Sequence, residues 1–534
     1  MAFSEYFHEI LKDIGIKNTE ESIPFLFPEI SHLGDPFWLN GVETVCEIIK
    51  KTISNKEKVF IYADGDMDGI AGASILGNFF KIIGIDFDVK LTHRLEEYEI
   101  DEIFIENILK MGYSLLFIID SGTNSKQALY YCESHNFTTI VIDHHIFNQK
   151  YKFSHVHFIN PYVDEDNAYS NMTSAGLTFK LLQALKIYLS FFPEECFFPS
   201  LELATLGTLN DYPVLRGENR IIIKIGLKHI VEGTNILGLK LFQQYFYVPQ
   251  KSDEIETITF FFNPRLNAPG RFGKPEISFN LLISNNQDEC EKALKEIENL
   301  SDRKQKMLKN VILKKDNIYE NDPSFLIFQD IPASFSGIIA SQTAAKYQKP
   351  SFVGIVSDDI IQGSARGFDE IDLHELFSKE KDIFLSFGGH KNAVGFKLRK
   401  KDINKVKKIW ESLETREKKV PQKNKIYDMP IEKLDINFIQ DLQLLKPFGR
   451  QHPEILFRSD SVQITKVVRK EKGKWVAWIK QNNFLFQAHF SNFKHLPNSD
   501  ISIIYSPQIK KLNSNLFIIW LDIKNYYNAT GDLQ

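Results

Sequence analysis

Short apolar runs alternate with amphipathic stretches between about residues 58 and 225. The apolar runs are rich in β-branched and aromatic residues and are too short for helices, which predicts strands at 58–64, 86–93, 114–120, 138–144 and 155–160. Residues 69–84 and 124–135 have helical spacing. Strands that alternate with helices predict a parallel sheet covered on both faces, and such sheets bind ligands at the carboxyl ends of their strands.

Three further regions follow this α/β region. Residues 285–320 are charged and contain no glycine, which predicts one long helix connecting two domains. A second α/β region extends over about 324–410. After a basic linker, strand-like runs at 461–470, 474–480, 501–506 and 516–523 predict a small barrel or sandwich.

Composition and charge narrow the class of protein. The chain has 534 residues, of which 43% are hydrophobic and 25% charged, so it is long enough for about three globular domains. Its net charge of −5 means that a nucleic acid would have to be bound by local basic surfaces. Four widely spaced cysteines disfavour a zinc ribbon or a disulfide scaffold. With neither a signal-peptide pattern nor a long apolar run, we expect a soluble cytoplasmic protein without a membrane partner.

Three aspartates, Asp64, Asp66 and Asp68, follow the first predicted strand at alternate positions. Alternate side chains share a face of an extended chain, so these carboxylates should converge. Like charges this close repel unless cations neutralise them, and Mg²⁺ or Mn²⁺ prefer such oxygen ligands. An EF-hand calcium loop begins similarly but needs a preceding helix and a later Glu, where this chain has Ile75. Considered alone, the motif could also be three solvated aspartates in a turn.

Acidic residues follow two more predicted strands and one apolar segment. Asp120 ends the strand 114–120, and Asp143, His144 and His145 follow the strand that begins at 138. Asp211 follows an apolar segment and precedes a proline turn. Imidazole is a good ligand for Mn²⁺. Together these residues predict a two-metal site that hydrolyses a phosphoester or pyrophosphate by direct attack of activated water.

The order of these motifs resembles the four signatures of the DHH phosphoesterase superfamily: D-x-D-x-D-G, D-x-G, D-H-H and G-T-x-x-D. The stretch SFGGHKNAVGF is similar to the G-G-H motif of the DHH-associated domain, which binds substrate phosphate. Other stretches resemble the RecJ family of single-stranded-DNA exonucleases: EESIPFLFPEISHLGDPFWLNGVETVCEIIKK, LRGENR, NPRLNAPGRFG, SGIIASQTAAKYQKP, GSARGF and PFGRQHPEILF. The matches extend over about residues 7–457, and the remaining tail fits the oligonucleotide-binding barrel of that family.

The resemblance implies an α/β fold with a DHH catalytic domain built on a parallel sheet, a long connecting helix, a second α/β domain and a C-terminal β-rich domain like an OB fold. The domain boundaries that we expect are 1–57 for an N-terminal lead-in, 58–284 for the catalytic domain, 285–322 for the connecting helix, 323–410 for the DHH-associated substrate-binding domain, 411–426 for a basic linker and 427–534 for the OB-like nucleic-acid-binding domain.

It also implies roles for the acidic cluster. Six metal ligands would be divided between two Mn²⁺ or Mg²⁺ ions: Asp64 and Asp66 on one ion, Asp68, His144 and Asp211 on the other, and Asp120 bridging. Asp143 and His145 would be catalytic, with His145 toward the scissile phosphate. The implied reaction is stepwise 5′→3′ hydrolysis of single-stranded DNA to 5′-mononucleotides in DNA repair and recombination. The implied partners are single-stranded DNA, a single-strand-binding protein and a helicase, with the chain itself a monomer.

Seven residues are expected to contact substrate: Asn267 and Arg271 in NAPGR, Ser364 and Arg366 in GSAR, and Gly388, Gly389 and His390 in GGH. The planar fork of arginine suits phosphate oxygens, and glycine lets the backbone approach a phosphate closely.

The chain departs from the family pattern at several positions. Gly65 replaces a usual aromatic, Pro269 a small residue and Gln342 a common arginine, and the stretch after Arg94 lacks the expected glycines. All metal ligands are present, so these departures are expected to alter the grip on substrate rather than the chemistry.

Lysines alternate with two tryptophans in the C-terminal strands. Lys466 and Lys480 accompany Trp475 and Trp478, a composition typical of a platform for single strands. The tryptophans are an odd number of residues apart, so on a regular strand they face opposite sides and one is expected to be buried.

Two other functions compete with an exonuclease. A DHH phosphodiesterase of short oligoribonucleotides or cyclic dinucleotides would need neither the N-terminal lead-in nor the C-terminal barrel. A catalytically inactive DNA-binding scaffold would not need the mutually repulsive aspartates.

Overall fold

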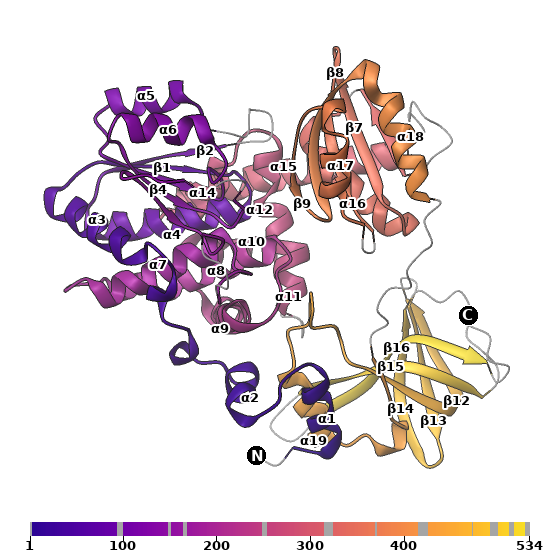
Figure 1. Ribbon diagram of the computed structural model, residues 1–534. Helices are drawn as coiled ribbons and strands as arrows, with labels where there is room; N and C mark the ends of the chain where they lie inside the picture. Colours follow the sequence, from indigo (N-terminus) through magenta and orange to yellow (C-terminus); the bar gives the residue numbers. More distant parts are fainter. Residues whose placement is uncertain are drawn as a thin grey trace.

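The computed structural model describes residues 3–92, 100–147, 151–163, 168–247, 254–313, 324–329, 331–368, 371–414, 425–471, 474–491, 500–511 and 517–528. Three bodies are visible in Figure 1: an α/β body with the first sheet, a smaller α/β body joined to it by helix α15, and a C-terminal barrel that lies close to the N-terminal helices. Among the described helices, none combines the length and the apolar character needed to cross a membrane.

The first sheet is entirely parallel and has the order β2-β1-β3-β4-β5. Its strands are β1 (Val59–Ala63), β2 (Phe87–Leu91), β3 (Leu115–Ile119), β4 (Thr138–Ile142) and β5 (Val156–Ile159). Every residue of β1 and β3 is buried. The sheet confirms the predicted fold class, and each strand lies within one of the apolar runs that predicted it.

Helices cover both faces of this sheet because successive strand side chains alternate between them. Val59, Ile61 and Ala63 of β1 belong to one core cluster, and Phe60 and Tyr62 to another. The first cluster includes residues of α3 (Val42–Asn55), α4 (Met67–Ile83), α7 (Ser174–Tyr188), α8 (Phe197–Asn210), α9 (Gly217–Gly233), α10 (Leu237–Tyr245) and α14 (Glu276–Ile283). The second includes α5 (Glu102–Lys110) and α6 (Lys126–Ser134).

The segment between α10 and α14 is made of short helical pieces. They are α11 (Glu254–Thr257), a π-helical turn (Ile258–Phe262), α12 (Asn263–Leu266) and α13 (Ala268–Arg271). This segment contains the NPRLNAPGR motif, which therefore forms a compact turn beside the first sheet rather than an extended loop.

Helix α15 (Gln287–Leu313) connects the first body to the second, as the long charged stretch predicted. The second sheet is mixed and has the order β6-β7-β8-β10-β9. Its strands are β6 (Phe325–Phe328), β7 (Ser351–Ser357), β8 (Ile360–Arg366), β9 (Phe384–His390) and β10 (Ala393–Arg399), accompanied by α16 (Ser336–Tyr347), α17 (Leu373–Lys379) and α18 (Ile403–Glu414). β6 and β7 are parallel, whereas β7, β8, β10 and β9 pair antiparallel.

The C-terminal strands close into a five-stranded barrel, as the resemblance implied. Strands β12 (Leu456–Glu471), β13 (Lys474–Gln481), β14 (Phe484–Ser491), β16 (Phe517–Asn528) and β15 (Ile501–Lys511) pair in that order, and β15 pairs back with β12. β11 (Ile426–Asp428) extends the sheet beside β12, and α19 (Ile436–Leu444) precedes the barrel. Trp475 packs against the barrel core, and Trp478 is 36% exposed.

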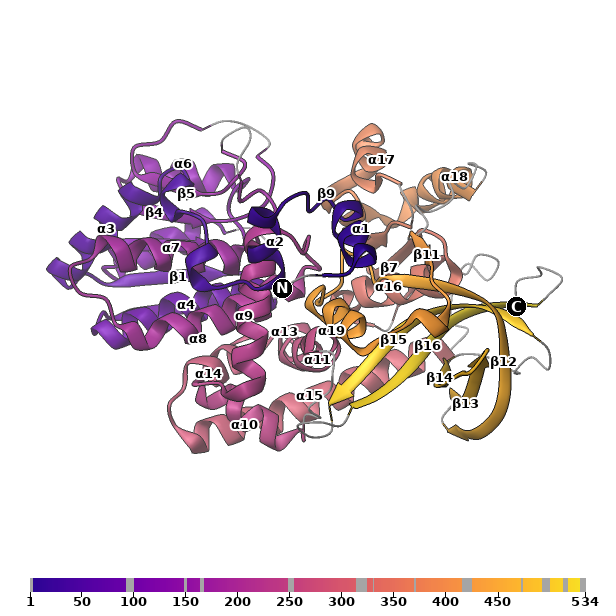
Figure 2. The same cartoon turned by 90° about the horizontal axis from the view of Figure 1, so that it is seen from below.

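The N-terminal helices share their core with this barrel. Phe7, Ile10 and Leu11 of α1 (Glu5–Asp13) and Phe25 and Leu26 of α2 (Thr19–Leu26) belong to the same buried cluster as the barrel strands and α19. Figures 1 and 2 both show α1 beside α19. The two ends of the described chain therefore pack together, with the catalytic body between them in sequence.

Candidate metal centre and substrate pocket

Three neighbouring strands bring their terminal aspartates side by side. Ala63 lies in register with Ile119, and Ile119 with Ile142. The ladder continues one residue further, since Asp64 N–H donates to Ile119 O (3.1 Å) and Asp120 N–H to Ile142 O (3.0 Å). Because parallel strands in register end at the same edge of a sheet, Asp64, Asp120 and Asp143 meet there.

Asp66 and Asp68 reach the same place by another route than the one predicted. Helix α4 begins at Met67, so the D-x-D-x-D stretch is not an extended chain. Asp66 is the N-cap, and its Oδ1 accepts from the Asp68 N–H (2.9 Å), while Asp68 lies in the first turn. The expectation that these carboxylates lie close together holds, but its reason was wrong: a strand-to-helix turn, and not strand alternation, aims them.

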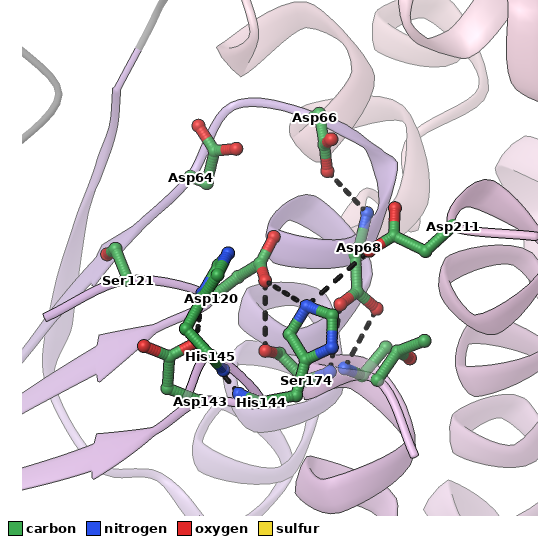
Figure 3. Close-up of polar contacts among 12 residues, drawn as sticks. Asp64, Asp66, Asp68, Asp120, Ser121, Asp143, His144, His145, Ser174 and Asp211 are labelled. Carbon is green, nitrogen blue, oxygen red and sulfur yellow. Dashed lines mark hydrogen bonds and ion pairs between the residues drawn. The ribbon is translucent and has the colours of Figure 1, made fainter. Parts of the chain in front are cut away.

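The side chains that meet at this edge form three overlapping groups of ligand atoms (Figure 3). Within each group the atoms lie within 4.8 Å of one another, and the groups are Asp64, Asp66 and Asp120; Asp68, His144 and Asp211; and Asp120, His144 and His145. Asp211 joins the cluster from the C-cap of α8. His144 Nε2 lies 3.4 Å from Asp120 Oδ1 and 3.5 Å from Asp211 Oδ2, which places it between the first and second groups.

Crowding and burial make the carboxylates hard to ionise together. Burial and the charges of Asp68 and Asp66 raise the pKa of Asp120 well above its usual range. Burial and the same two neighbours raise the pKa of Asp211 to about 7. Burial opposes protonation of His144, but Asp211 and Asp68 raise its pKa. Such a set of oxygen and imidazole ligands fits divalent cations, which would remove the repulsion.

The backbone of Asp120 is held in an unusual conformation. Its φ of 58° lies in the left-handed region, which non-glycine residues rarely adopt, and Gly122 also has a positive φ of 91°. Backbone strain of this kind persists where the surrounding structure fixes it and is common at functional sites. Here the Asp120 carboxylate reaches both Asp64 and Asp66 on one side and His144 and His145 on the other.

Several residues that the motifs did not indicate orient the carboxylates. The Ser174 and Ala175 N–H groups at the start of α7 donate to Asp68 (2.8 and 3.0 Å), and Ser174 Oγ donates to Asp120 Oδ1 (3.0 Å). The hydroxyl of Thr92, which follows β2, donates to Asp64 Oδ1 (3.0 Å). The N-terminus of a helix favours anions, so α7 stabilises this acidic edge. In the sequence, only the Thr173–Ser174 pair before the α7 pattern would have indicated a helix start there.

Asp143 and His145 form a hydrogen-bonded pair at the edge of the third ligand group. His145 Nδ1 lies 2.7 Å from Asp143 Oδ1, and Asp143 raises the pKa of His145 to about 9. Burial by itself would raise the pKa of Asp143. The charge of His145 and its hydrogen bond outweigh burial and hold the pKa of Asp143 well below its usual range. Asn160 helps to hold this pair in place. Its Nδ2 donates to His145 O (2.9 Å) and to the hydroxyl of Thr123 (3.0 Å), and the Thr123 N–H donates to Asp143 Oδ2 (3.2 Å).

A pocket opens beside the first group of carboxylates. It is lined by Asp64, Gly65, Asp66, Thr92, Asn267, Gly270 and Arg271. The NAPGR turn thus lies directly against the D-G-D turn. Asn267 Nδ2 donates to Asn210 Oδ1 (2.7 Å), and Asn210 Nδ2 donates to Asp211 Oδ1 (3.0 Å), which links this turn to a metal-ligand candidate.

The departure at Gly65 has a local steric reason. A Cβ at this position would lie 1.8 Å from Thr92 O and 3.1 Å from Pro275 Cβ, so no side chain fits without moving the end of β2. Pro269, the second departure, is buried in the first turn of α13. Gln342 is exposed on α16, and Arg94 lies outside the described residues.

The other substrate-contact candidates lie on the second sheet. Ser364 and Arg366 are in β8, where Ser364 Oγ lies 3.1 Å from Ser336 Oγ and Arg366 Nη1 donates to Ala365 O (3.0 Å). Gly388, Gly389 and His390 are in β9, and the side chain of His390 lies outside what the structure describes. Arg271 connects the pocket to this body, since its Nη1 donates to Ser334 O (2.7 Å).

Comparison with known proteins gives two family matches. Residues 58–208 match the DHH family, N-terminal domain, and residues 427–518 match the RecJ OB domain. The first match contains Asp64, Asp66, Asp68, Asp120 and the Asp-His-His triplet.

Over most of its length the chain is also similar to proteins named as single-stranded-DNA-specific exonucleases. It is 28% identical to the single-stranded-DNA-specific exonuclease RecJ of Bacillus subtilis over 82% of this chain and 56% of that protein. It is 27% identical to RecJ of Thermus thermophilus over 78% of this chain and 61% of that protein. The crystal structure of the Thermus RecJ in complex with Mn²⁺ superposes with a TM-score of 0.79 at 21% identity, covering 97% of this chain and 75% of that one. The chain thus spans little more than half the length of these two relatives.

Proposed function

We propose that this chain, which matches the DHH family over residues 58–208 and the RecJ OB domain over 427–518, is a metal-dependent exonuclease of single-stranded DNA. We further propose that it works from the 5′ end and releases 5′-mononucleotides. The observation that carries the proposal is the meeting of three overlapping ligand groups with the pocket that contains Asn267 and Arg271.

The ligand groups fit two divalent cations, Mn²⁺ or Mg²⁺. Asp64 and Asp66 would hold one, and Asp68, His144 and Asp211 the other. Asp120, which groups with Asp64 and Asp66 and lies 3.4 Å from His144 Nε2, would contact both. When bound, such cations activate water and stabilise negative charge on phosphoryl oxygens.

The remaining residues would contact the substrate or hold a proton at a defined atom. Asp143 accepts the Nδ1 proton of His145, so the imidazole ring is held in one orientation and presents Nε2 to the scissile phosphate. Arg271 at the pocket would bind a phosphate through its planar fork, and Asn267 would contact the same nucleotide. Ser364, Arg366 and the GGH strand would hold the strand on the second body.

The exposed residues of the barrel favour a polymeric substrate rather than a dinucleotide. Trp478 is 36% exposed on β13 and lies in register with Lys466 of β12, while Lys480 is exposed two residues further along. An exposed ring flanked by cations can stack on a base while the lysines meet phosphates, a contribution of about 1–3 kcal/mol per stacked base.

The test uses purified protein, Mn²⁺, and 30-mers labelled at the 5′ or the 3′ end, single-stranded or duplex, of DNA or RNA. We expect mononucleotide release from the 5′ label of single-stranded DNA and no release after the metal is removed with a chelator. If the 30-mers survive while di- to pentanucleotides disappear, the small-substrate phosphodiesterase is correct instead. If DNA is bound but never cleaved, the chain is a scaffold.

A further inference from the structure

Two motifs that match the exonuclease family take no part in the site described above. LRGENR leads into α9, and PFGRQHPE lies between α19 and β12. In the fold they face each other and form the contact between the catalytic body and the barrel. We call this contact the joint: Arg216, Arg220 and Lys224 on one side and residues 444–452 on the other.

Arg220 is the centre of the joint. Its side chain is almost wholly buried, with 1% of the residue exposed, and its guanidinium carbon lies 3.7 Å from the centre of the Phe25 ring. Nε donates to Phe25 O (2.8 Å), and the two Nη atoms donate to the carbonyl oxygens of Leu444, Leu445, Lys446 and Pro447 at 3.0–3.3 Å. The guanidinium group thus ties α9 to both α2 and the entry to the barrel.

The charge at the joint is balanced by helix ends. Lys224 Nζ donates to Leu26 O (2.7 Å) and Leu444 O (2.8 Å), the last residues of α2 and α19. The final carbonyl groups of a helix lack partners within it and carry the negative end of the helix dipole. Arg220 and Lys224 satisfy these groups at two helices at once, so the relative position of the two bodies is defined closely.

A short segment of chain connects the joint to the candidate metal ligand Asp211. Val214 pairs with Arg450 in a parallel bridge, and Leu215 N–H donates to Arg450 O (3.3 Å). Two residues separate Val214 from Asp211, and one of them, Tyr212, has a φ of 50°. A left-handed tyrosine has few alternative backbone conformations, so we expect a displacement of Val214 to reach Asp211.

We propose that the joint sets the position of Asp211, which makes Arg220 a positioning residue for the metal centre. The inference rests on the proposed function for its biological meaning. Movement of the barrel when a strand binds would then alter the metal site through Val214 and Asp211, in addition to changing the grip on DNA. In the simpler alternative, the joint only holds the barrel where it can grip a long strand.

Two variants perturb the joint in different ways. Arg220→Gln removes the buried fork, with Arg220→Lys as the conservative variant that keeps the charge and some donors. Gly449→Ala leaves the charge intact and adds only a methyl group. Its Cβ would lie 2.7 Å from Leu215 Cδ1. Because the φ of Gly449 is not left-handed, alanine adds a steric clash at the joint without backbone strain. Val462→Ala, in the barrel core on β12, changes none of the joint's hydrogen bonds and is the control for general destabilisation.

The first measurement is Mn²⁺ binding to the DNA-free protein, followed by the electron paramagnetic resonance signal of free Mn²⁺. We expect Arg220→Gln and Gly449→Ala to raise the dissociation constant of the weaker ion about tenfold, Arg220→Lys to raise it less, and Val462→Ala to leave it unchanged. Unchanged Mn²⁺ binding in both joint variants would overturn the proposal.

The second measurement separates kcat from KM on a 5′-phosphorylated dinucleotide and on a 30-mer. A positioning role predicts a lower kcat on both substrates. A raised KM confined to the 30-mer would show that the joint serves only the grip on DNA. If the unaltered protein binds Mn²⁺ but cleaves nothing, the proposed function fails, whereas the Mn²⁺ comparison still decides the role of the joint.

Discussion

The metal centre and the joint are two clusters of charged side chains separated by a short segment of chain, and their charges are balanced in different ways. At the joint, Arg220 and Lys224 have main-chain carbonyl oxygens as partners, supplied by the ends of α2 and α19 and the loop after α19. At the metal centre, the ligand groups contain five aspartates and two imidazoles, His144 and His145, and burial and neighbouring carboxylates raise the pKa values of Asp120 and Asp211.

The way in which the charges are balanced distinguishes a cluster that stabilises the fold from one that binds a ligand. A buried charge that the chain itself balances stabilises one arrangement of the fold and needs nothing further. A cluster whose like charges remain crowded is stable in its ionised form only with cations from outside, and that requirement marks a binding site. The segment from Asp211 to Arg220 belongs to both clusters.

The largest expected effect comes from Asp120, which belongs to two of the ligand groups. Asp120→Ala should lower nuclease activity by at least about 1,000-fold, equivalent to about 4 kcal/mol of transition-state stabilisation, because both cations lose a ligand. Mononucleotide release from labelled single-stranded DNA measures this. The matched control is Asp86→Asn, whose side chain is 71% exposed, and it should keep full activity. Retention of a tenth of the activity by Asp120→Ala would contradict the assignment.

At the joint, removal of the charge should cost stability. Arg220→Met removes the donors to the buried carbonyl oxygens of Phe25 and Pro447, whereas Leu444 O keeps its bond from Lys224, and at about 1–3 kcal/mol per unsatisfied group we expect a loss of at least about 2 kcal/mol. Thermal unfolding of both proteins under identical conditions tests this. Arg458→Met, at an exposed pair with Asp460, should change the stability by less than about 1 kcal/mol. Equal melting temperatures would mean that water replaces the guanidinium at no cost.

The joint should also respond to pH. Burial, reinforced by Arg220, lowers the pKa of His452 to about 4, below the value near 6.5 of an unfolded chain. Since the unfolded state then binds the proton more readily, this histidine contributes stability above about pH 6.5 that is lost as the pH falls toward 4. We expect a loss of about 2 kcal/mol between pH 7 and pH 5.

Denaturant unfolding at the two pH values, with His452→Gln beside the unaltered protein, measures the contribution of His452. The glutamine variant should show a pH 7 to pH 5 difference smaller by that amount, while the exposed His135→Gln should behave like the unaltered protein. The same pH difference in all three proteins would exclude the histidine as its source.

The smallest effect concerns the groups that orient the metal ligands. Thr92→Val removes the hydroxyl that donates to Asp64 Oδ1 while keeping the side-chain shape, and we expect about tenfold weaker Mn²⁺ binding. Titration calorimetry with Mn²⁺ gives the value. Thr52→Val, which is also buried but lies on α3 away from the site, is its control. If both variants bind Mn²⁺ equally well, Asp64 does not depend on Thr92.

The sequence by itself determined the first sheet, the connecting helix and the identity of the acidic cluster. Strand alternation and helical spacing are local properties, and strands such as β1 and β3 are buried on both faces, so their apolar runs are unambiguous. Asp64, Asp120 and Asp143 could be grouped because parallel strands in register end at one edge. The resemblance to a known family narrowed the predicted barrel or sandwich to an OB-like barrel and added the candidate substrate contacts.

Only the tertiary structure decided how these parts act on one another. Asp66 and Asp68 converge through a helix start, Thr92, Asn160 and Ser174 orient the site from segments distant in sequence, and Phe7 and Phe25 enter the core of a barrel that begins after residue 450. The partners of Arg220 are main-chain carbonyl groups, which every residue carries, so no sequence pattern marks them. Their position depends on how helix ends pack, and packing between distant segments leaves no local periodicity to detect.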